Sequence, residues 1–271
     1  MNFMHAMAAA RDRNRSMLCV GLDPEPEKFP AHLRGHPDAI FEFCRAVIDA
    51  TADLVCAFKP QIAHFAARGE ESALQRLIEY INAEHSHVPV ILDAKRGDIG
   101  STAAYYAEEA FDRYKADAVT LNPYLGRDSV QPFLDRTNKG AVLLCRTSNS
   151  GAADFQDLPV DGMPLYQRVA KIIADDWNGN GNCLLVTGAT WPSEIGQIRA
   201  LVGDMPLLVP GIGAQGGDVE AVVKNGQDAR GNGLLISSSR SILYASNGDD
   251  FSNAARAAAL NLRDEINRHR K

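Results

Sequence analysis

Short apolar runs rich in β-branched residues recur along the whole chain, and each ends in polar or glycine-containing sequence. Their hydrophobicity is nearly continuous rather than alternating, which is typical of strands covered on both faces in a parallel sheet. Segments with helical spacing of apolar residues lie between them, as at Leu74, Leu77 and Ile81. The eight runs span residues 17–22, 55–58, 88–92, 118–121, 141–145, 183–187, 207–209 and 234–236.

This alternation of strand and helix predicts a (β/α)8 barrel, a fold for which 271 residues is an ordinary length. A doubly wound open sheet is the structural alternative. Because no linker rich in proline, glycine or serine divides the chain, we expect one domain over residues 1–271. Residues 1–16 are rich in arginine and poor in acid, as in a transit peptide, but they lack the apolar core of a secretory signal. We expect a short amphipathic leader helix that caps the barrel.

The composition narrows the class of protein. Apolar residues make up 45% and charged residues 23%, which is typical of a soluble globular protein. The net charge of -6 argues against nucleic-acid binding, and no apolar run is long enough to span a bilayer. The five cysteines form no CxxC pair and no metal-ligand spacing with histidine. These features predict a reduced, cytoplasmic protein without structural zinc.

The segment 92–102, LDAKRGDIGST, follows the third apolar run and carries an unusual cluster of charge. On an extended backbone Asp93 and Lys95 share a face, and Asp98 follows closely. Two carboxylates beside an ammonium are costly to assemble, so the cluster indicates catalysis rather than folding. For Asp98 the alternative is an N-cap of a helix that begins near Ile99.

In barrels of this kind the chemistry lies at the carboxyl ends of the strands. Lys59 alone would be a solvated charge, but beside the carboxylates of the third strand it is a plausible ion partner. Asp23 alone could start a turn before a proline. The predicted rim collects Asp23, Lys59, Asp93, Lys95, Asn122, Thr147, Ser148, Thr190, Ser239 and Arg240.

The glycine-rich segment 210–217, PGIGAQGG, has the GxGxxG spacing, which alone is weak evidence for a dinucleotide site. The acidic residue expected about twenty positions later is missing. A phosphate cradle of backbone N–H groups is the better interpretation, with Ser239 and the Arg240 guanidinium beside it. The alternative is a flexible surface turn. The segment 148–164 has no clear periodicity and predicts either a lid or binding loop or a disordered connection.

Seven motifs occur in the order GLDP, FKP, LDAKRGDIGSTA, LNPYLG, RTSN, PGIGAQGG and SRSILYA. With these motifs the chain resembles the orotidine 5'-phosphate decarboxylase family over nearly its whole length, and in particular the longer bacterial-type branch. The resemblance implies a carboxy-lyase that converts orotidine 5'-phosphate to uridine 5'-phosphate and CO2 in de novo pyrimidine biosynthesis. It also implies a homodimer with two shared active sites and a small-molecule substrate. From the net charge and the lack of a long apolar run we expect neither a nucleic acid nor a membrane as partner.

The resemblance also implies a role for each matching residue. Lys59, Asp93, Lys95 and Asp98 would form a charge network at the reacting carbon, and Asp98 and Thr102 would reach into the partner's site. Asp23 would bind ribose hydroxyls, Ser148 the pyrimidine amide edge, Gln215 both base and phosphate, and Arg240 the phosphate. Ser239 stands where many members have glycine, which puts the approach of the phosphate in question.

No pyridoxal, thiamine or metal signature is present in the sequence, so we expect no cofactor and no metal. The protein's own charges would then stabilise the carbanion that loss of CO2 leaves on the pyrimidine ring, and Lys95 would donate the proton to it. Two other functions stay open at this point. One is a sugar-phosphate lyase or synthase of a related, metal-dependent barrel family. The other is a non-catalytic phosphoribosyl-binding protein. A Schiff-base aldolase is disfavoured because a lysine flanked by carboxylates stays protonated.

Overall fold

The computed structural model describes residues 2–213 and 217–271. Eight strands form one parallel sheet in the order β2-β1-β10-β9-β8-β5-β4-β3. Parallel bridges from Phe58 to Val90 and from Gln61 to Asp93 join β2 to β3 and close the barrel. This confirms the predicted (β/α)8 barrel, and the open doubly wound sheet is wrong. The strands are β1 (Leu18–Leu22), β2 (Ala57–Pro60), β3 (Ile91–Arg96), β4 (Ala118–Leu121), β5 (Gly140–Arg146), β8 (Cys183–Thr187), β9 (Leu207–Pro210) and β10 (Leu234–Ser238).

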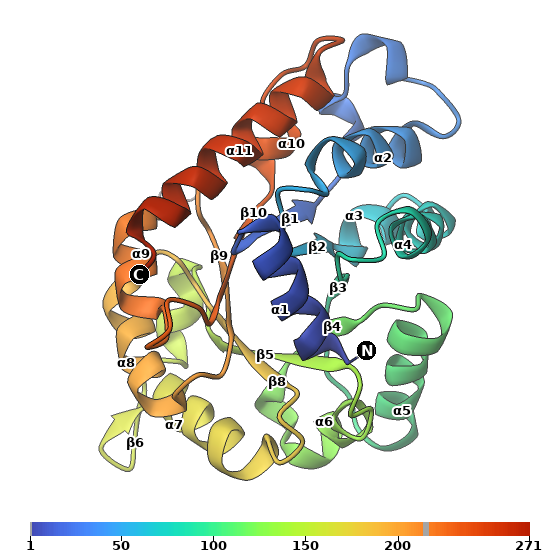
Figure 1. Ribbon diagram of the computed structural model, residues 1–271. Coiled ribbons are helices and arrows are strands. Elements are labelled where there is room, and N and C mark those ends of the chain that lie inside the picture. Colours follow the sequence, from blue (N-terminus) through green and yellow to red (C-terminus); the bar gives the residue numbers. More distant parts are fainter. Residues whose placement is uncertain (1, 214–216) are drawn as a thin grey trace.

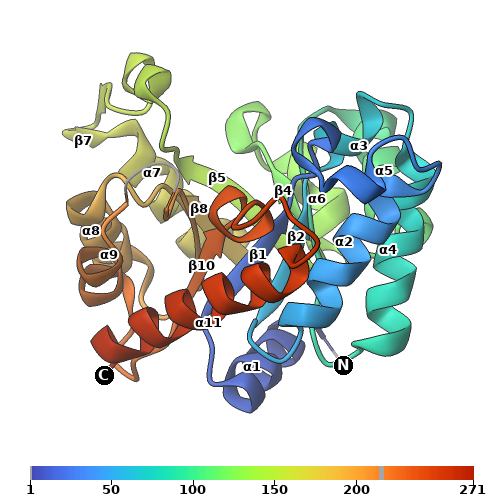
Figure 2. The same cartoon turned by 90° about the horizontal axis from the view of Figure 1, so that it is seen from above.

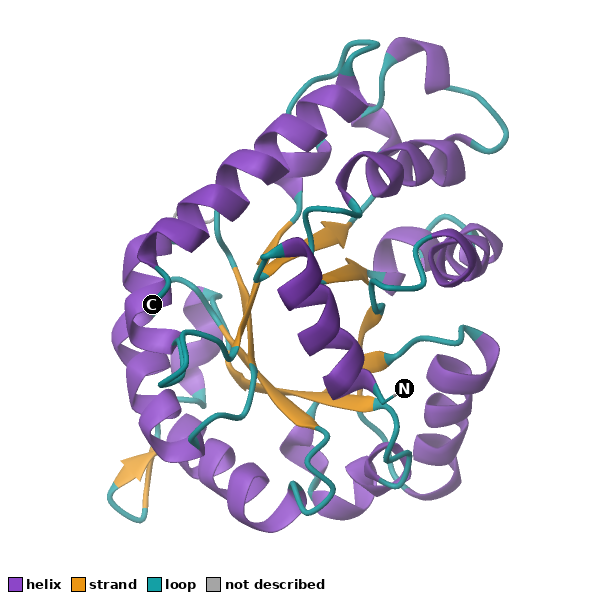
Figure 3. Ribbon diagram, in the orientation of Figure 1, coloured by secondary structure: helices purple, strands orange, loops and turns teal. Residues whose placement is uncertain are grey.

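Helices surround this ring of strands, as Figures 1 and 3 show. The longer ones are α2 (Ala39–Thr51), α4 (Glu71–Glu84), α5 (Gly100–Glu108), α6 (Arg127–Leu134), α7 (Leu165–Ile172), α8 (Pro192–Val202), α9 (Val219–Gly226) and α11 (Phe251–His269). Two short helices, α3 (Ile62–Ala66) and α10 (Arg240–Leu243), follow β2 and β10. The predicted helical spacing at Leu74, Leu77 and Ile81 lies on the buried face of α4.

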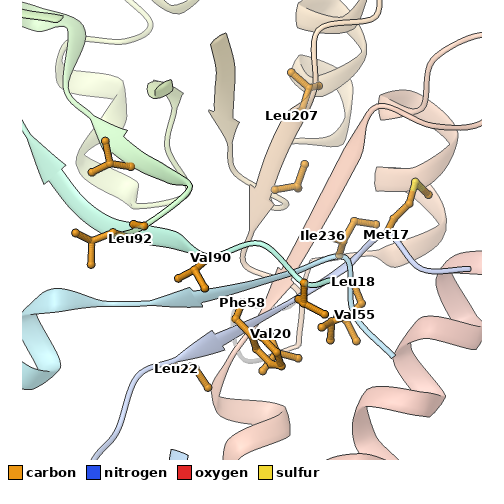
Figure 4. Close-up of a cluster of buried hydrophobic side chains, with 14 of the residues drawn as sticks. Met17, Leu18, Val20, Leu22, Val55, Phe58, Val90, Leu92, Leu207 and Ile236 are labelled. Carbon is orange, nitrogen blue, oxygen red and sulfur yellow. The ribbon is translucent and has the colours of Figure 1, made fainter. Parts of the chain in front are cut away.

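The core has two layers, because successive residues of each strand face opposite sides of the sheet. Leu18 and Val20 of β1 face the helices and pack with Phe58 and Ile236, as Figure 4 shows. Cys19 between them faces the barrel interior. Each of the eight strands contributes to that interior cluster, through Cys19, Ala57, Ile91, Ala118, Val142, Leu184, Leu208 and Leu235. This double burial explains why the runs are continuously apolar.

A helix at the amino terminus, α1 (Phe3–Asn14), lies where the leader helix was expected. Asn2 caps it by accepting a hydrogen bond from the amide of His5. Phe3 and Met7 lie on its buried face and join the interior cluster of the barrel. Figure 1 shows α1 across the mouth of the ring, and Figure 2 shows it on the side opposite the short strand β7 (Met163–Pro164). Helix α1 therefore closes one end of the barrel. A functional site is expected at the other end, where the strands have their carboxyl ends.

The connection 148–164 is more ordered than its sequence suggests. It contains a 3-10 helix (Ser150–Asp154) and an antiparallel hairpin of β6 (Pro159–Val160) and β7 (Met163–Pro164). Asp161 and Gly162 form the two-residue turn with φ of 51° and 81°. Both values are those of a type I′ turn, for which Asp-Gly is a favoured pair. The alternative of a disordered connection is therefore wrong for this part, and the lid or binding loop stays a prediction.

Within the described residues, no helix is both long and apolar enough to cross a membrane. The five cysteines all lie within the described residues, where each is buried and carries a free thiol.

Candidate active site

Three charged side chains from two adjacent strands meet at the carboxyl end of the barrel. Lys59 of β2 places Nζ 2.8 Å from Oδ2 of Asp93 in β3. Lys95 places its Nζ 2.6 Å from Oδ1 of the same carboxylate. Lys59 and Asp93 are each only 6% exposed, whereas the Lys95 side chain is 47% exposed and so remains available to a ligand.

The cluster shifts the proton affinities of its buried members. Burial alone would raise the pKa of Asp93, but the ammonium groups of Lys59 and Lys95 hold it well below its ordinary value. Burial would likewise lower the pKa of Lys59, but the carboxylates of Asp93 and Asp23 raise it above its ordinary value. Both groups therefore stay charged at neutral pH, and the cluster is an ion array rather than a proton-sharing pair.

The backbone brings Lys95 to Asp93 in a way that the sequence did not predict. Lys95 has φ of 47°, so the chain is in the left-handed region there and not extended. The register between β3 and β4 also shifts between Leu92 and Arg96. The expectation that Asp93 and Lys95 lie together is met, but the extended geometry on which it rested is wrong. A bulge turns the Lys95 side chain back onto the carboxylate.

Thr120 of β4 was missed by the sequence reasoning. It is 1% exposed, and its hydroxyl lies 2.8 Å from Oδ1 of Asp93. The hydroxyl oxygen of Thr120 also accepts hydrogen bonds from the amides of Ala94 and Lys95. A signal existed in the sequence: a threonine inside a buried apolar strand needs a hydrogen-bond partner.

These side chains border a cavity of about 490 Å³, a volume that suits a small-molecule ligand. Ser148, after β5, and Pro210, at the end of β9, line the same cavity. Leu144, Val186 and Leu208 give it an apolar wall. The predicted residues Lys59, Asp93, Lys95 and Ser148 are thus brought together around one space.

Asp23 and Ser239 lie together at the neighbouring strand ends β1 and β10. A Cβ on Gly21 would lie 3.1 Å from Oγ of Ser239 and 3.6 Å from Oδ1 of Asp23, so both oxygens flank the same point. Within the described residues, each of these two oxygens is buried and has no hydrogen-bond partner. Buried polar atoms are normally paired, so this pair of oxygens is suited to ligand hydroxyls.

The predicted phosphate end is only partly described. Arg240 follows Ser239 at the start of α10 and is exposed. Gly213 has φ of 84°, and a Cβ there would lie 2.8 Å from Oγ of Ser241, so the turn requires glycine. Gln215 lies outside the described residues. Arg240 and the tight turn at Gly213 therefore follow the neighbouring strands β10 and β9, and the phosphate cradle stays a prediction.

Asp98 and Thr102 are placed apart from the cavity of their own chain. Helix α5 begins at Gly100 with Ile99 as the cap residue, so the N-cap interpretation of Asp98 is wrong. The Asp98 carboxylate accepts a hydrogen bond from the amide of Ile99 at 2.8 Å. Thr102 is exposed on α5 and lines a separate surface hollow with Tyr105 and Tyr106.

A second group of missed residues anchors the connection 148–164 to the rim. Gln156 accepts a hydrogen bond from the amide of Thr147 at 2.9 Å and donates to its hydroxyl at 2.8 Å. The buried guanidinium of Arg146 lies 3.2 Å from Asp157 and 4.6 Å from the Trp191 ring centroid. Because Gln156 also lines the cavity, this network fixes one side of the site.

A closed (β/α)8 barrel with charged side chains around a cavity at the carboxyl ends of its strands has the architecture of a barrel enzyme. Residues 16–256 match the profile described as "Orotidine 5'-phosphate decarboxylase / HUMPS family". The chain therefore belongs to the orotidine 5'-phosphate decarboxylase family. This confirms the resemblance seen in the seven motifs.

Curated relatives extend over the full length. The protein from Azoarcus sp. (strain BH72) named "Orotidine 5'-phosphate decarboxylase" is 66% identical over 270 residues, which cover 100% of both chains. One of the same name from Cellvibrio japonicus is 62% identical and covers 98% of both. Among solved structures, Leishmania donovani OMP decarboxylase is 39% identical with a TM-score of 0.86, covering 99% of this chain and 98% of that one. Leishmania donovani UMP synthase has a TM-score of 0.89 at 40% identity, and this chain spans 56% of its length.

Proposed function

We propose that this chain decarboxylates orotidine 5'-phosphate to uridine 5'-phosphate and CO2, as a carboxy-lyase of pyrimidine biosynthesis. The observation that carries the proposal is the Lys59–Asp93–Lys95 array at the cavity wall. The full-length relatives bear the decarboxylase name, and nothing in the site favours a sugar-phosphate lyase or a non-catalytic binding protein.

Loss of CO2 leaves the bonding electron pair on C6 of the pyrimidine, where the ring delocalises it poorly. An ammonium held at this carbon stabilises the developing negative charge and then donates its proton there. Lys95 has the reach and the exposure for this role, and Asp93 holds it at 2.6 Å. Asp93 also lies beside the position of the substrate carboxylate, which favours departure of that charge. Lys59 keeps Asp93 ionised.

The rest of the substrate extends along the rim. Ser148 binds the amide edge of the pyrimidine, next to the apolar wall that receives the ring. Asp23 binds ribose hydroxyls, and its unpartnered oxygen beside Ser239 supports this role. Arg240 binds the phosphate, with the backbone around Gly213 and with Gln215. Binding energy from the remote phosphate then helps to assemble the reactive geometry.

The same proposal includes a homodimer whose two active sites are shared. Asp98 and Thr102 contribute nothing to the cavity of their own chain, which suits side chains that serve the partner's site. Ile99 and Tyr105 beside them are 59% and 67% exposed, as expected of a surface that a second copy covers. We also place the protein in the cytoplasm, acting as one domain over residues 1–271, and its five free buried thiols are consistent with a reducing compartment.

The test follows the absorbance of orotidine 5'-phosphate with purified protein in the presence of EDTA. Steady turnover to uridine 5'-phosphate is the expected result. Activity that is lost with the chelator would point instead to the metal-dependent lyase or synthase. Binding of uridine 5'-phosphate without any turnover would leave a phosphoribosyl-binding protein.

A further inference from the structure

The hydroxyl of Thr120 uses all of its hydrogen-bonding capacity inside the charge array. A threonine hydroxyl has one donor and two acceptor sites. The donor goes to Oδ1 of Asp93 at 2.8 Å. The two acceptor sites receive the amide of Ala94 at 3.0 Å and the amide of Lys95 at 2.9 Å. The buried Thr120 side chain therefore contacts both the carboxylate of Asp93 and the backbone of Lys95, whose ammonium binds that carboxylate.

These contacts lie where the sheet is irregular. The pairing of β3 with β4 shifts register between Leu92 and Arg96, and the two amides at this place donate to a side chain. Lys95 has the left-handed φ of 47°, which residues with a side chain rarely adopt. Such a conformation persists only where the surrounding structure holds it. Thr120 supplies that hold at the amide of Lys95 itself.

We propose that Thr120 is a positioning residue for the decarboxylation, acting through Asp93 and Lys95. Its hydroxyl fixes the bulge that aims the Lys95 side chain, and it fixes the carboxylate that receives the ammonium. Lys95 Nζ and the Thr120 hydroxyl both meet Oδ1 of Asp93, so the hydroxyl sets the position of the oxygen on which the ammonium rests. The inference rests on the proposed function, in which Lys95 is the acid at C6.

A purely structural role for Thr120 makes a different prediction. If the buried hydroxyl served only as a hydrogen-bond partner for the backbone amides of β3, its removal would lower the stability of the protein. The rate of the chemical step in the folded variant would not change. A positioning role lowers kcat while the affinity for uridine 5'-phosphate stays the same, because the phosphate and ribose contacts lie at other strand ends.

The experiment compares Thr120→Ser with Thr120→Ala, which differ only in the hydroxyl. Both side chains are smaller than threonine and fit the site, and Thr120→Val serves as the variant of equal volume. For Thr120→Ala we expect kcat to fall roughly 100-fold, the loss typical of a misplaced catalytic group. Thr120→Ser keeps the hydroxyl, so its kcat stays within about threefold of wild type. The Kd for uridine 5'-phosphate stays within about twofold in both variants.

Each outcome decides the proposal. Equal kcat in the serine and alanine variants would overturn it, whatever happens to the melting temperature. A parallel loss of kcat and of uridine 5'-phosphate affinity in the alanine variant would also overturn it in favour of a structural role. The wild-type assay separates the two levels: absence of turnover in wild type sinks the proposed function, whereas an active wild type with an unaffected Thr120→Ala variant sinks only this inference.

Discussion

The ammonium of Lys59 lies 2.8 Å from Oδ2 of Asp93, and both side chains are almost completely buried. Taking two charges out of water is costly, and the attraction between them offsets that cost only when the geometry is good. This costly buried pair lies at the carboxyl end of the barrel and lines the cavity. The pair keeps Asp93 anionic under the more exposed Lys95, which is the group left free to meet a ligand.

Removing one partner of this pair should destabilise the fold. Lys59→Met leaves the buried Asp93 with one ammonium fewer, and we expect unfolding to become easier by about 3 kcal/mol at neutral pH. Urea denaturation measures this difference. Lys224→Met is the matched control, since Lys224 forms an exposed helix pair with Glu220 and should change stability by less than about 0.5 kcal/mol. Equal effects in the two variants would contradict the ion array.

The same pair gives stability a defined pH dependence. The folded-state pKa of Asp93 lies below the ordinary 3.8, so its contribution is present above that value and is lost as pH falls below it. The folded-state pKa of Lys59 lies above the ordinary 10.5, so its contribution is present below that value and is lost as pH rises past it. The stability difference between wild type and Lys59→Met should therefore be constant between about pH 5 and 9 and shrink below about pH 4. A difference that grows on acidification would contradict this assignment.

Buried thiols should weaken the protein in alkali. Burial raises the pKa of Cys19, Cys145 and Cys183 from 9.0 to about 12. A raised pKa contributes stability that is complete below the unfolded value and is lost as pH rises past it. We therefore expect the urea concentration at the unfolding midpoint to decrease as pH rises above about 9. The decrease should be less steep in Cys19→Ala. At neutral pH the thiols should react with an alkylating reagent only after the protein unfolds. Rapid alkylation of the native protein would contradict their burial.

Phosphate recognition is tested at Arg240. Arg240→Ala should reduce kcat/KM for orotidine 5'-phosphate by roughly 100-fold, because a guanidinium pairs strongly with a phosphate dianion. Turnover of the phosphate-free nucleoside, orotidine, should change little. Arg136→Ala is a suitable control, since Arg136 pairs with Asp112 on the outside of the barrel. Equal losses for both substrates would remove the phosphate assignment.

Sharing of sites between subunits is tested by mixing two inactive variants. Lys95→Ala and Asp98→Ala should each be inactive alone. After the mixed protein is dissociated and reassembled, half of the dimers are mixed and each holds one intact site. About a quarter of the wild-type activity should then return, as two-fold symmetry requires. No recovery in a sample shown to contain mixed dimers would contradict the shared site.

The barrel was predictable because burial on both faces leaves a simple signal. Every one of the eight apolar runs became a strand, and the run 118–121 matches β4 at both ends. The third run was predicted at 88–92, but β3 extends to Arg96. Its second half contains the charged residues Asp93 and Lys95, which line the cavity, so hydrophobicity could not reveal this part of the strand.

Within the site, residue type was more predictable than geometry. Lys59, Asp93 and Lys95 stand at strand ends that parallel pairing must bring together. The left-handed Lys95 and the role of Thr120 depend on a register shift between β3 and β4, which no local pattern encodes. The N-cap interpretation of Asp98 failed because helix α5 begins one residue further on than the pattern indicated.

The role of Lys95 in decarboxylation is tested most directly by the turnover of Lys95→Ala on orotidine 5'-phosphate, measured alongside its affinity for uridine 5'-phosphate. Removal of the proton donor at C6 should lower decarboxylation by about 10³-fold or more, while the folded variant still binds the product. Near-normal turnover in the purified variant would show that Lys95 is not the acid at C6 and would contradict the proposed mechanism.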